Sequence, residues 1–221
     1  MSENIWNLSG PAAECLSKAD ADRRNQLMLE SPSRSDGDLL RLLSGGDEEA
    51  FLDFYRRHQG LVYRFALQMS GKTEIAEEVT QEVFMVVMAS GARYDAGRGS
   101  VAAYLYGIAR NIVLRALERE RPYLTTLDEA DTVYVDGDVL GDLARSERLE
   151  TLRKAVLALP PSYREVVVLC DLHERDYAEA AAALGCAIGT VRSRLHRARA
   201  LLAEKMRAGE RDAVWKTSES Y

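Results

Sequence analysis

The chain has 221 residues, enough for two small domains, and 47% of them are hydrophobic while only 7% are aromatic. This composition is typical of helical bundles with aliphatic cores. A formal net charge of -6 argues against a uniformly basic nucleic-acid binder, and no apolar run is long enough to cross a bilayer.

Residues 1–36 form a polar extension that contains Gly10, Pro11 and Pro32, and we expect it to be poorly ordered. It lacks a positively charged start followed by an apolar core, which is the pattern of a secretory signal. The sequence therefore predicts a cytoplasmic protein without membrane insertion.

Residues 37–121 carry four helical patterns, and we expect them to form an all-helical bundle. Apolar residues recur at helical spacing over 39–43, 50–69, 75–88 and 101–118, with glycine-containing loops between them. Asp47 is a good N-cap for the second helix, and Thr73 for the third.

The third of these helices has one apolar and one acidic face. Its acidic face carries Glu74, Glu77, Glu78, Gln81 and Glu82. Such a stripe is either a solvent-facing surface or a protein-binding one. A carboxylate metal site is disfavoured, because helical di-metal sites use Glu-x-x-His pairs and His58 is the only histidine in this half.

The fourth helix follows the loop from Tyr94 to Ser100 and combines aromatic with cationic residues. Aromatic rings on a helix can stack on the bases of single-stranded DNA, and cations beside them can bind its phosphates. The spacing of Tyr104 and Ile108 favours packing of Tyr104 in the core, whereas Arg110, Asn111 and Arg115 are costly to bury unpaired.

Residues 122–148 form an acidic linker, with Gly137 and Gly141 among its aspartates. Its composition cannot bury enough apolar surface to fold alone, so one reading is a solvated tether. The alternative is a segment whose negative charge is used by a partner.

We expect residues 149–207 to form a helix-turn-helix domain and residues 208–221 to form a tail. Asp176 caps a short Ala-rich helix, and Gly185 ends it before a basic helix. Val191, Leu195, Ala198 and Leu202 place one apolar stripe on this second helix, and its other side is rich in arginine. The alternative to a DNA-reading helix is an ordinary core helix with a solvated basic face.

Three stretches resemble bacterial extracytoplasmic-function (ECF) sigma factors of the sigma-70 family. LALPPSYREVVVLCDLHERDYAEAAAALGCAIGTVRSRLHRARALL, from Leu157 to Leu202, resembles their C-terminal domain, which reads the -35 promoter element. AEEVTQEVF resembles their polymerase-binding helix, and YDAGRGSVAAYLYGIARNIVLRALER their promoter-opening segment. The chain departs from the family at Glu174, where Gly is common, and at Ala187, where Ser or Pro is common.

The resemblance implies three sets of site residues. The -35 contacts would be Thr190, Arg192, Ser193, Arg194, His196, Arg197 and Arg199. The -10 contacts would be Tyr94, Arg98, Tyr104, Tyr106, Arg110, Asn111, Arg115 and Arg119. The polymerase contacts would be Glu77, Glu78, Gln81, Glu82 and Phe84.

The function implied is a sigma factor and not an enzyme, with two helical bundles joined by a flexible acidic linker. Its partners would be core RNA polymerase, duplex -35 and single-stranded -10 promoter DNA, and an anti-sigma factor, and the linker would thread through polymerase. No cofactor or metal is expected. The competing hypothesis is a stand-alone helix-turn-helix regulator that binds a palindromic operator as a dimer.

The three cysteines, Cys15, Cys170 and Cys186, lack the paired spacing and the nearby histidines of a structural zinc site. We expect Cys170 and Cys186 to be small core residues, with a redox-sensing role as the alternative.

Overall fold

The computed structural model describes residues 34–90, 94–120 and 142–218, and every regular element in these ranges is a helix. The predicted extension at 1–33 and most of the predicted linker, 121–141, lie outside the described residues. In chain order the elements are α2 (Asp36–Leu43), α3 (Glu48–Ser70), α4 (Thr73–Ser90), the 3-10 turn η2 (Ala96–Arg98), α5 (Val101–Glu120), α6 (Asp142–Leu157), α7 (Pro161–Val167), the π-helical segment η3 (Val168–Leu172), α8 (Tyr177–Leu184) and α9 (Ile188–Ser218). The expected all-α class is confirmed.

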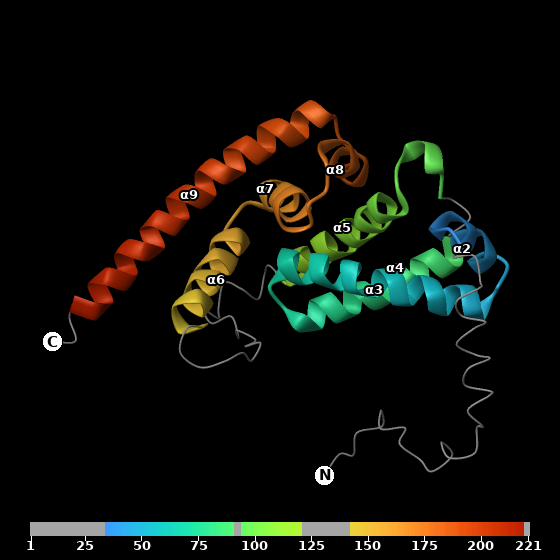
Figure 1. The fold of residues 1–221 in the computed structure, drawn as a ribbon, viewed down its shortest axis with the longest axis horizontal. Helices are drawn as coiled ribbons and strands as arrows, with labels where there is room; N and C mark the ends of the chain where they lie inside the picture. Colours follow the sequence, from blue (N-terminus) through green and yellow to red (C-terminus); the bar gives the residue numbers. More distant parts are fainter. Residues whose placement is uncertain (1–33, 91–93, 121–141, 219–221) are drawn as a thin grey trace, which may run out of the picture. The chain divides into compact units, whose positions relative to one another are not determined.

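Helices α2 to α5 form what we call the N-terminal bundle, in which α3, α4 and α5 pack on one another (Figure 1). The predicted cap of α3 is present, since the Asp47 side chain accepts a hydrogen bond from the Ala50 amide at 2.9 Å. Gly71 ends the helix with φ 75°, in the left-handed region that favours glycine.

The core of the N-terminal bundle combines aliphatic side chains with a cluster of aromatic rings. Phe54 and Phe65 are fully buried, and Phe84 is 3% exposed with its ring 4.7 Å from that of Tyr55. Burial of such large apolar side chains contributes about 1.5–3 kcal/mol each, so this core fixes the positions of the surface residues on α4 and α5.

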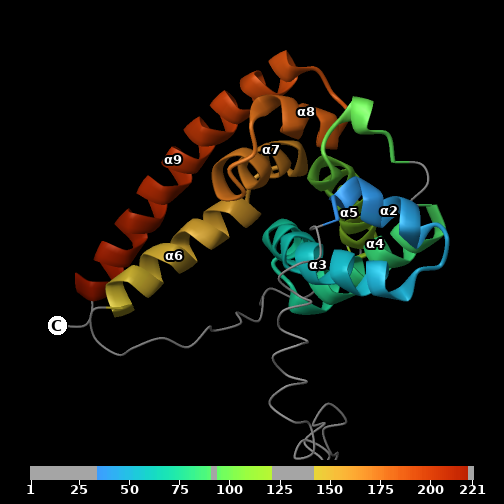
Figure 2. The ribbon, with the colours of Figure 1, turned by 45° about the vertical axis from the view of Figure 1, so that its right-hand side comes forward.

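Helices α6 to α9 form the C-terminal bundle, in which the long α9 packs against α6, α7 and α8 (Figures 1 and 2). The helix-turn-helix is confirmed: Asp176 accepts from the Glu179 amide at 2.7 Å, and Gly185 has φ 62° at the end of α8. Two boundaries differ from expectation. Helix α6 already begins at Asp142, inside the predicted linker, and α9 continues through most of the predicted tail to Ser218.

Glu174, in the loop between η3 and α8, has φ 55° and is the only non-glycine residue of the described chain with a positive φ. Left-handed backbone costs an L-amino acid roughly 1–2 kcal/mol because its Cβ approaches the following carbonyl. Glycine, which the resemblance leads us to expect at this position, would not carry this cost.

Replacing Glu174 with glycine is therefore expected to stabilise the C-terminal bundle by about 0.5–1 kcal/mol, the strain relieved less the extra chain entropy of glycine. Urea unfolding of Glu174→Gly and of the control Glu174→Ala, which retains a Cβ, measures the effect. An equal stability of the two variants would contradict the strain assigned to this residue.

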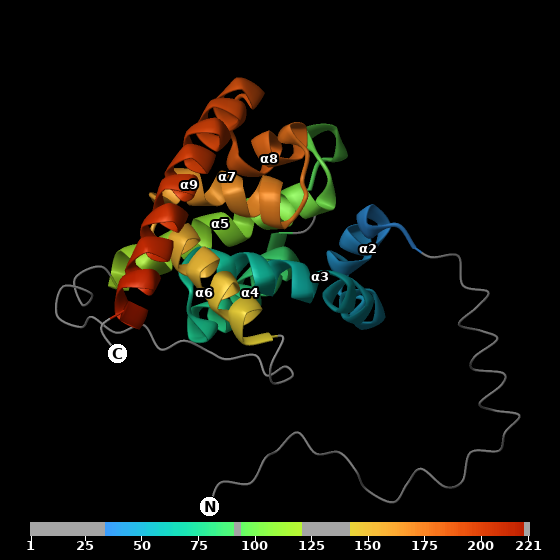
Figure 3. The same cartoon turned by 60° about the vertical axis from the view of Figure 1, so that its left-hand side comes forward.

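The two bundles also pack on each other within the compact unit Asp36–Tyr221. Helix α5 contacts α3 and α4 on one side and α8 on another, so that it lies between the bundles (Figure 3). Gly71 adjoins Leu157 of α6, and the guanidinium of Arg164 in α7 donates to the Met69 carbonyl at the end of α3. The sequence predicts two bundles on a tether and does not predict this direct contact.

Candidate nucleic-acid interface

The first part of the candidate site is the N-terminal half of α9, where the predicted apolar stripe is buried. Val191 and Ala198 are 0% exposed, and Leu195 is 2% exposed. This packing turns the opposite side of the helix to solvent, where most of the predicted -35 residues are exposed: Arg192, Ser193, His196, Arg197 and Arg199. Thr190 and Arg194 are half-buried.

The arginines of α9 differ in what holds them. The Arg192 guanidinium lies 5.5 Å from the centre of the Tyr177 ring, a cation–π contact with the first residue of α8. Arg199 is held by two hydrogen bonds to Asp171, which raise the pKa of its guanidinium further. Arg197 has no ion-pair partner in the described part of the chain, so among these three it is the cation with no competing contact.

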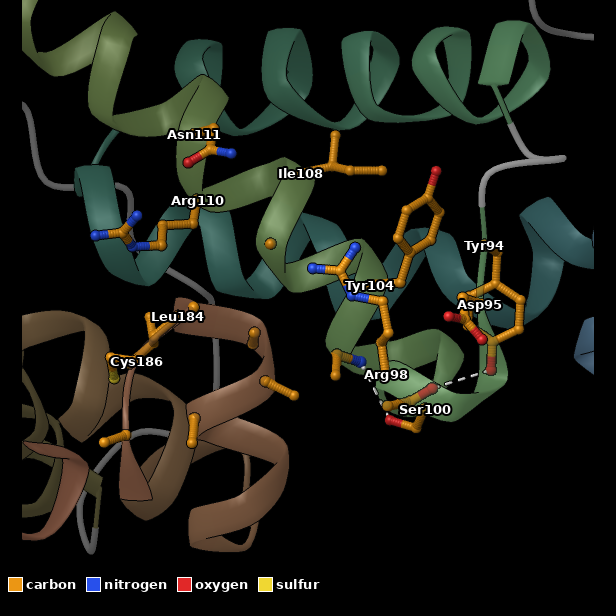
Figure 4. A pocket seen from close by; sticks show the side chains of 18 residues that line it. Tyr94, Asp95, Arg98, Ser100, Tyr104, Ile108, Arg110, Asn111, Leu184 and Cys186 are labelled. Carbon is orange, nitrogen blue, oxygen red and sulfur yellow. Dashed lines mark hydrogen bonds between the residues drawn. The ribbon is translucent and has the colours of Figure 1, made fainter. Parts of the chain in front are cut away.

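The second part of the candidate site is a cavity of about 880 Å³ between the loop before α5, α5 itself and the end of α8 (Figure 4). Five predicted -10 residues line it, namely Tyr94, Arg98, Tyr104, Arg110 and Asn111. The Tyr94 hydroxyl donates to the Gly99 carbonyl at 3.1 Å, and the Tyr94 and Tyr104 ring centres are 5.7 Å apart. Tyr104 is thus packed and half-buried, with its ring at the cavity, as its spacing predicted.

The far wall of this cavity belongs to the C-terminal bundle. Ala181 to Ala187, at the end of α8 and in the turn before α9, face the residues of α5 (Figure 4). Cys186 is one of them. In this arrangement the predicted -10 surface opens onto the helix-turn-helix and not onto an unobstructed surface.

Tyr106 and Arg110 of α5 differ from the expectation that they lie free for DNA. Tyr106 is 1% exposed, and its hydroxyl donates to Nδ1 of His173 at 2.6 Å, while burial raises its pKa to about 12. Arg110 donates through Nε to the Glu165 carboxylate at 2.6 Å. Both side chains are directed to the C-terminal bundle, because α5 lies between the bundles.

Arg115 and Arg119, the remaining predicted -10 cations, lie at the far end of α5 and are exposed. Arg115 pairs with Glu82 at 3.3 Å, and Arg119 pairs with Glu78 at 3.0 Å. Exposed pairs of this kind contribute about 0–1 kcal/mol, so a nucleic-acid phosphate or a protein partner can replace either member at little cost.

The predicted polymerase-binding face of α4 lies beside these arginines. Glu77, Glu78 and Gln81 are exposed, and Glu82 is half-buried. Phe84 differs from expectation: it is buried among the rings of the N-terminal bundle and so cannot contact a partner directly. Its ring packs against rings of α3 and so helps to hold α4 in place.

Two residues of this face were missed by the sequence analysis. Met85 is 62% exposed and Met88 is 54% exposed, one helical turn and two turns beyond Gln81. Solvent-exposed methionines beside an acidic stripe are typical of a protein-binding surface. Met85 and Met88 follow Gln81 by four and seven residues, so the sequence places them on the same helix face as Gln81. Because both are apolar, they were counted among the residues expected in the core.

His173 links the two bundles as a neutral imidazole. Nδ1 accepts from Tyr106, and the other nitrogen donates to the Gln68 side-chain carbonyl at 2.8 Å. Burial, and then the nearby Arg64 and Arg175 cations, lower its pKa to about 4.

Acidification is therefore expected to destabilise the fold between about pH 6.5 and pH 4. In this window the unfolded chain binds a proton at His173 and the folded chain does not. The free energy of unfolding therefore decreases as the pH is lowered. Burial also lowers the pKa of His58, which acts in the same direction. Urea unfolding from pH 7.5 to 4.5 measures the slope, and a slope unchanged in His173→Gln would remove His173 from this account.

Among the residues that the structure describes, no group of three or more histidine, cysteine, aspartate or glutamate side chains gathers where it could hold a metal ion. Burial raises the pKa of the Cys170 thiol to about 11, which keeps the reactive thiolate scarce at neutral pH.

Within the described part of the chain, no helix is long and apolar enough to span a membrane.

Comparison with known proteins gives the class to which this fold and site belong. The family described as Sigma-70 region 2 matches residues 54–123, and Sigma-70, region 4 matches residues 149–202. The first match contains α4, α5 and the loop between them, and the second contains the helix-turn-helix. The fold and the candidate site thus define a protein of the sigma-70 class.

Individual relatives narrow the class. The chain is 34% identical over 175 residues to the ECF RNA polymerase sigma factor SigM of Mycobacterium tuberculosis, covering 77% of this chain and 84% of SigM. It is 37% identical over 150 residues to SigE of Mycolicibacterium smegmatis, covering 66% of this chain and 58% of SigE. The chain belongs to the ECF RNA polymerase sigma factors.

Solved structures agree on the fold. CnrH in complex with the cytosolic domain of CnrY has a TM-score of 0.60 at 24% identity, covering 78% of this chain and 97% of CnrH. The sigma factor RpoE of Bartonella quintana, in complex with the anti-sigma factor NepR, has a TM-score of 0.56 at 28% identity, covering 70% and 97%.

Proposed function

We propose that this chain directs core RNA polymerase to promoters by reading the -35 duplex with α9 and the melted -10 strand with α5 and its preceding loop. The observation that carries this proposal is the exposed basic side of α9, fixed by a buried apolar stripe, in a chain of this family. The chain performs no chemical step itself, because synthesis belongs to polymerase, and it acts in the cytoplasm.

At the -35 element, we assign base contacts to the start of α9 and phosphate contacts to its arginines. A helix of this kind enters the major groove with its N-terminal residues at base edges, where arginine can bind guanine through two hydrogen bonds. Thr190, Arg192 and Ser193 lie in that first turn and a half, and Arg197 lies one turn further along. We place this function in a domain spanning residues 149–207.

At the -10 element, we assign the cavity beside Tyr94, Arg98 and Tyr104 to an extruded base, and the exposed Asn111, Arg115 and Arg119 to the strand that follows. Stacking on an aromatic ring contributes about 1–3 kcal/mol per base and does not depend on which base is stacked. Opening follows because the chain binds melted DNA more tightly than paired DNA. This domain would span residues 37–121, with the acidic linker at 122–148.

Polymerase binding is assigned to the exposed face of α4, with Glu77, Glu78, Gln81 and Glu82 forming its acidic part. Met85 and Met88 extend the same face with apolar surface. An anti-sigma factor is the second proposed protein partner, since RpoE, a relative of similar fold, was solved bound to one.

Transcription of fragmented genomic DNA with purified core polymerase tests the function, with sequencing of the transcript 5′ ends. We expect starts that are absent with core alone and that share two sequence elements upstream. A set of starts unchanged by adding the chain would overturn the proposal. Tight, sequence-specific duplex binding by the chain without polymerase would favour the stand-alone regulator instead.

A further inference from the structure

Tyr177 is the first residue of α8, the short helix that packs on the basic helix α9 (Figure 1). The cap before it fixes its place, since Asp176 accepts a hydrogen bond from the Glu179 amide at 2.7 Å. The side chain is nevertheless 37% exposed. Tyr177 is thus held at the surface of the helix-turn-helix, beside the first turns of α9, where the proposed -35 contacts begin.

The Tyr177 ring contacts Arg192 of α9. The guanidinium carbon of Arg192 lies over the ring, 5.5 Å from its centre, which is within the range of a cation–π attraction. Both residues are exposed, so the ring is not needed to compensate a buried charge. An exposed arginine side chain otherwise samples many rotamers. The contact with Tyr177 therefore restricts where the Arg192 guanidinium lies.

Arg199 lies seven residues later, on the same side of α9, and is held in a different way. Its Nε and Nη2 donate to the Asp171 carboxylate at 3.1 Å and 2.5 Å. An arginine binds guanine through two parallel hydrogen bonds from its N–H groups. The carboxylate thus occupies N–H groups that Arg199 would need to read a base.

The ring contact of Arg192 leaves its N–H groups available. An aromatic ring attracts the guanidinium through its face and does not use up the hydrogen-bond donors at the guanidinium edge. A side chain that is already restricted loses less conformational entropy when it binds a partner. Of these two restrained arginines, Arg192 is the one that is both ordered and free to donate to a base.

We propose that Tyr177 is a positioning residue for -35 recognition: its ring holds the Arg192 guanidinium ready to bind a guanine, while Asp171 keeps Arg199 out of base reading. Tyr177 acts through Arg192 and reads no base itself. The selectivity for one base pair then depends on a residue of α8 as well as on α9. The role in recognition rests on the function proposed above, whereas the restraint on Arg192 rests on the contact alone.

The restraint is tested in the purified full chain by ¹⁵N relaxation of the Arg192 Nε–Hε group. We expect its order parameter to fall in Tyr177→Leu and to be kept in Tyr177→Phe, which retains the ring. Tyr163→Leu is the matched control, because it makes the same change at a half-buried tyrosine of α7 for which the described structure shows no cation–π contact. An Arg192 side chain that is equally ordered in the wild type and in Tyr177→Leu would overturn the proposal.

The effect on recognition is measured as binding of the holoenzyme to a mapped promoter and to variants changed one base pair at a time across the -35 element. We expect Tyr177→Leu to bind the parent promoter about twofold to fivefold more weakly. The loss should vanish on the variant that lacks the guanine read by Arg192, because that contact is already missing there. Tyr177→Phe should bind all promoters as the wild type does.

A double variant tests whether Tyr177 acts through Arg192. Tyr177→Leu should cause no further loss in an Arg192→Ala background. Additive losses, a loss that is uniform across the promoter variants, or an equal loss in Tyr177→Phe would overturn the proposal, since each gives Tyr177 a contact of its own or a structural role. Wild-type binding by Arg192→Ala would overturn it as well.

These outcomes are distinct from a failure of the proposed function. That function fails if transcript starts are unchanged when the chain is added to core polymerase. The order of the Arg192 side chain is measured without DNA or polymerase, so it decides on the restraint in either case. Thermal unfolding of Tyr177→Leu checks that the helix-turn-helix keeps its stability.

Discussion

Reversing the charge of Glu78 and Glu82 is expected to abolish stable association with core polymerase, with an affinity loss of about 100-fold or more. Removing one member of a complementary charged interface costs about 2–5 kcal/mol, and a lysine adds repulsion against a basic partner. In this chain the lysines would also repel Arg119 and Arg115, their present partners. Co-elution of Glu78→Lys/Glu82→Lys with core enzyme on size exclusion measures the effect.

The control for this experiment carries the same change of charge on another helix. Glu49 and Asp53 are exposed on α3, four residues apart, and Glu49→Lys/Asp53→Lys is expected to associate normally. Gel shift of the two full-length variants on promoter duplex should be equal, because both leave the helix-turn-helix unchanged. Normal co-elution of Glu78→Lys/Glu82→Lys would reduce the acidic stripe to a solvated surface.

Truncating Arg197 or Arg192 to alanine is expected to weaken promoter binding by the assembled holoenzyme by about 1–3 kcal/mol, or roughly 5-fold to 150-fold, if guanine is read through two hydrogen bonds. The loss should be specific to one base position. A loss that is uniform across promoters and reduces the salt dependence would instead assign the residue to a phosphate.

The contacts of α9 give this prediction an internal ranking. Arg197 has no competing partner in the described chain, whereas Arg199 is already neutralised by Asp171, so Arg199→Ala should cost less than Arg197→Ala. Arg207, exposed some three turns further along, is the control and should be neutral. Wild-type transcription from a panel of promoters by both Arg192→Ala and Arg197→Ala would remove these residues from the site.

The acidic net charge of the chain is consistent with DNA binding that depends on polymerase. At -6 the whole chain is repelled by DNA, yet the cations concentrate on α9 and on the end of α5. We therefore expect the free chain to bind promoter duplex weakly, with polymerase supplying most of the positive surface.

Local signals in the sequence predicted the helices and most of their caps, because they depend on neighbouring residues. Thr73, the predicted cap of α4, is instead the first residue of that helix. Asp47, Asp176 and Gly185 perform the roles expected of them, and the stripe from Val191 to Leu202 is buried. The basic face of α9 followed directly from that periodicity.

The contact between the bundles was not predictable in the same way. Helix α5 is covered on two sides, so its apolar residues do not form a single stripe, and Tyr106 was assigned to the surface when it is in the core. The same applies to Phe84, since α4 packs against both α3 and α5. Glu165 gave no signal at all, because its partners Arg110 and Arg194 are 55 and 29 residues away.

The measurement that tests the account most directly is transcription from a mapped promoter in which the distance between its two elements is changed. Two domains fixed on one polymerase read two elements only at a set separation and on a set side of the helix, so inserting about 5 base pairs, roughly half a helical turn, should abolish transcripts from that start. Restoring the original spacing with altered intervening sequence should restore them. Transcription that persists at the same start with the insertion would contradict recognition by two coupled domains.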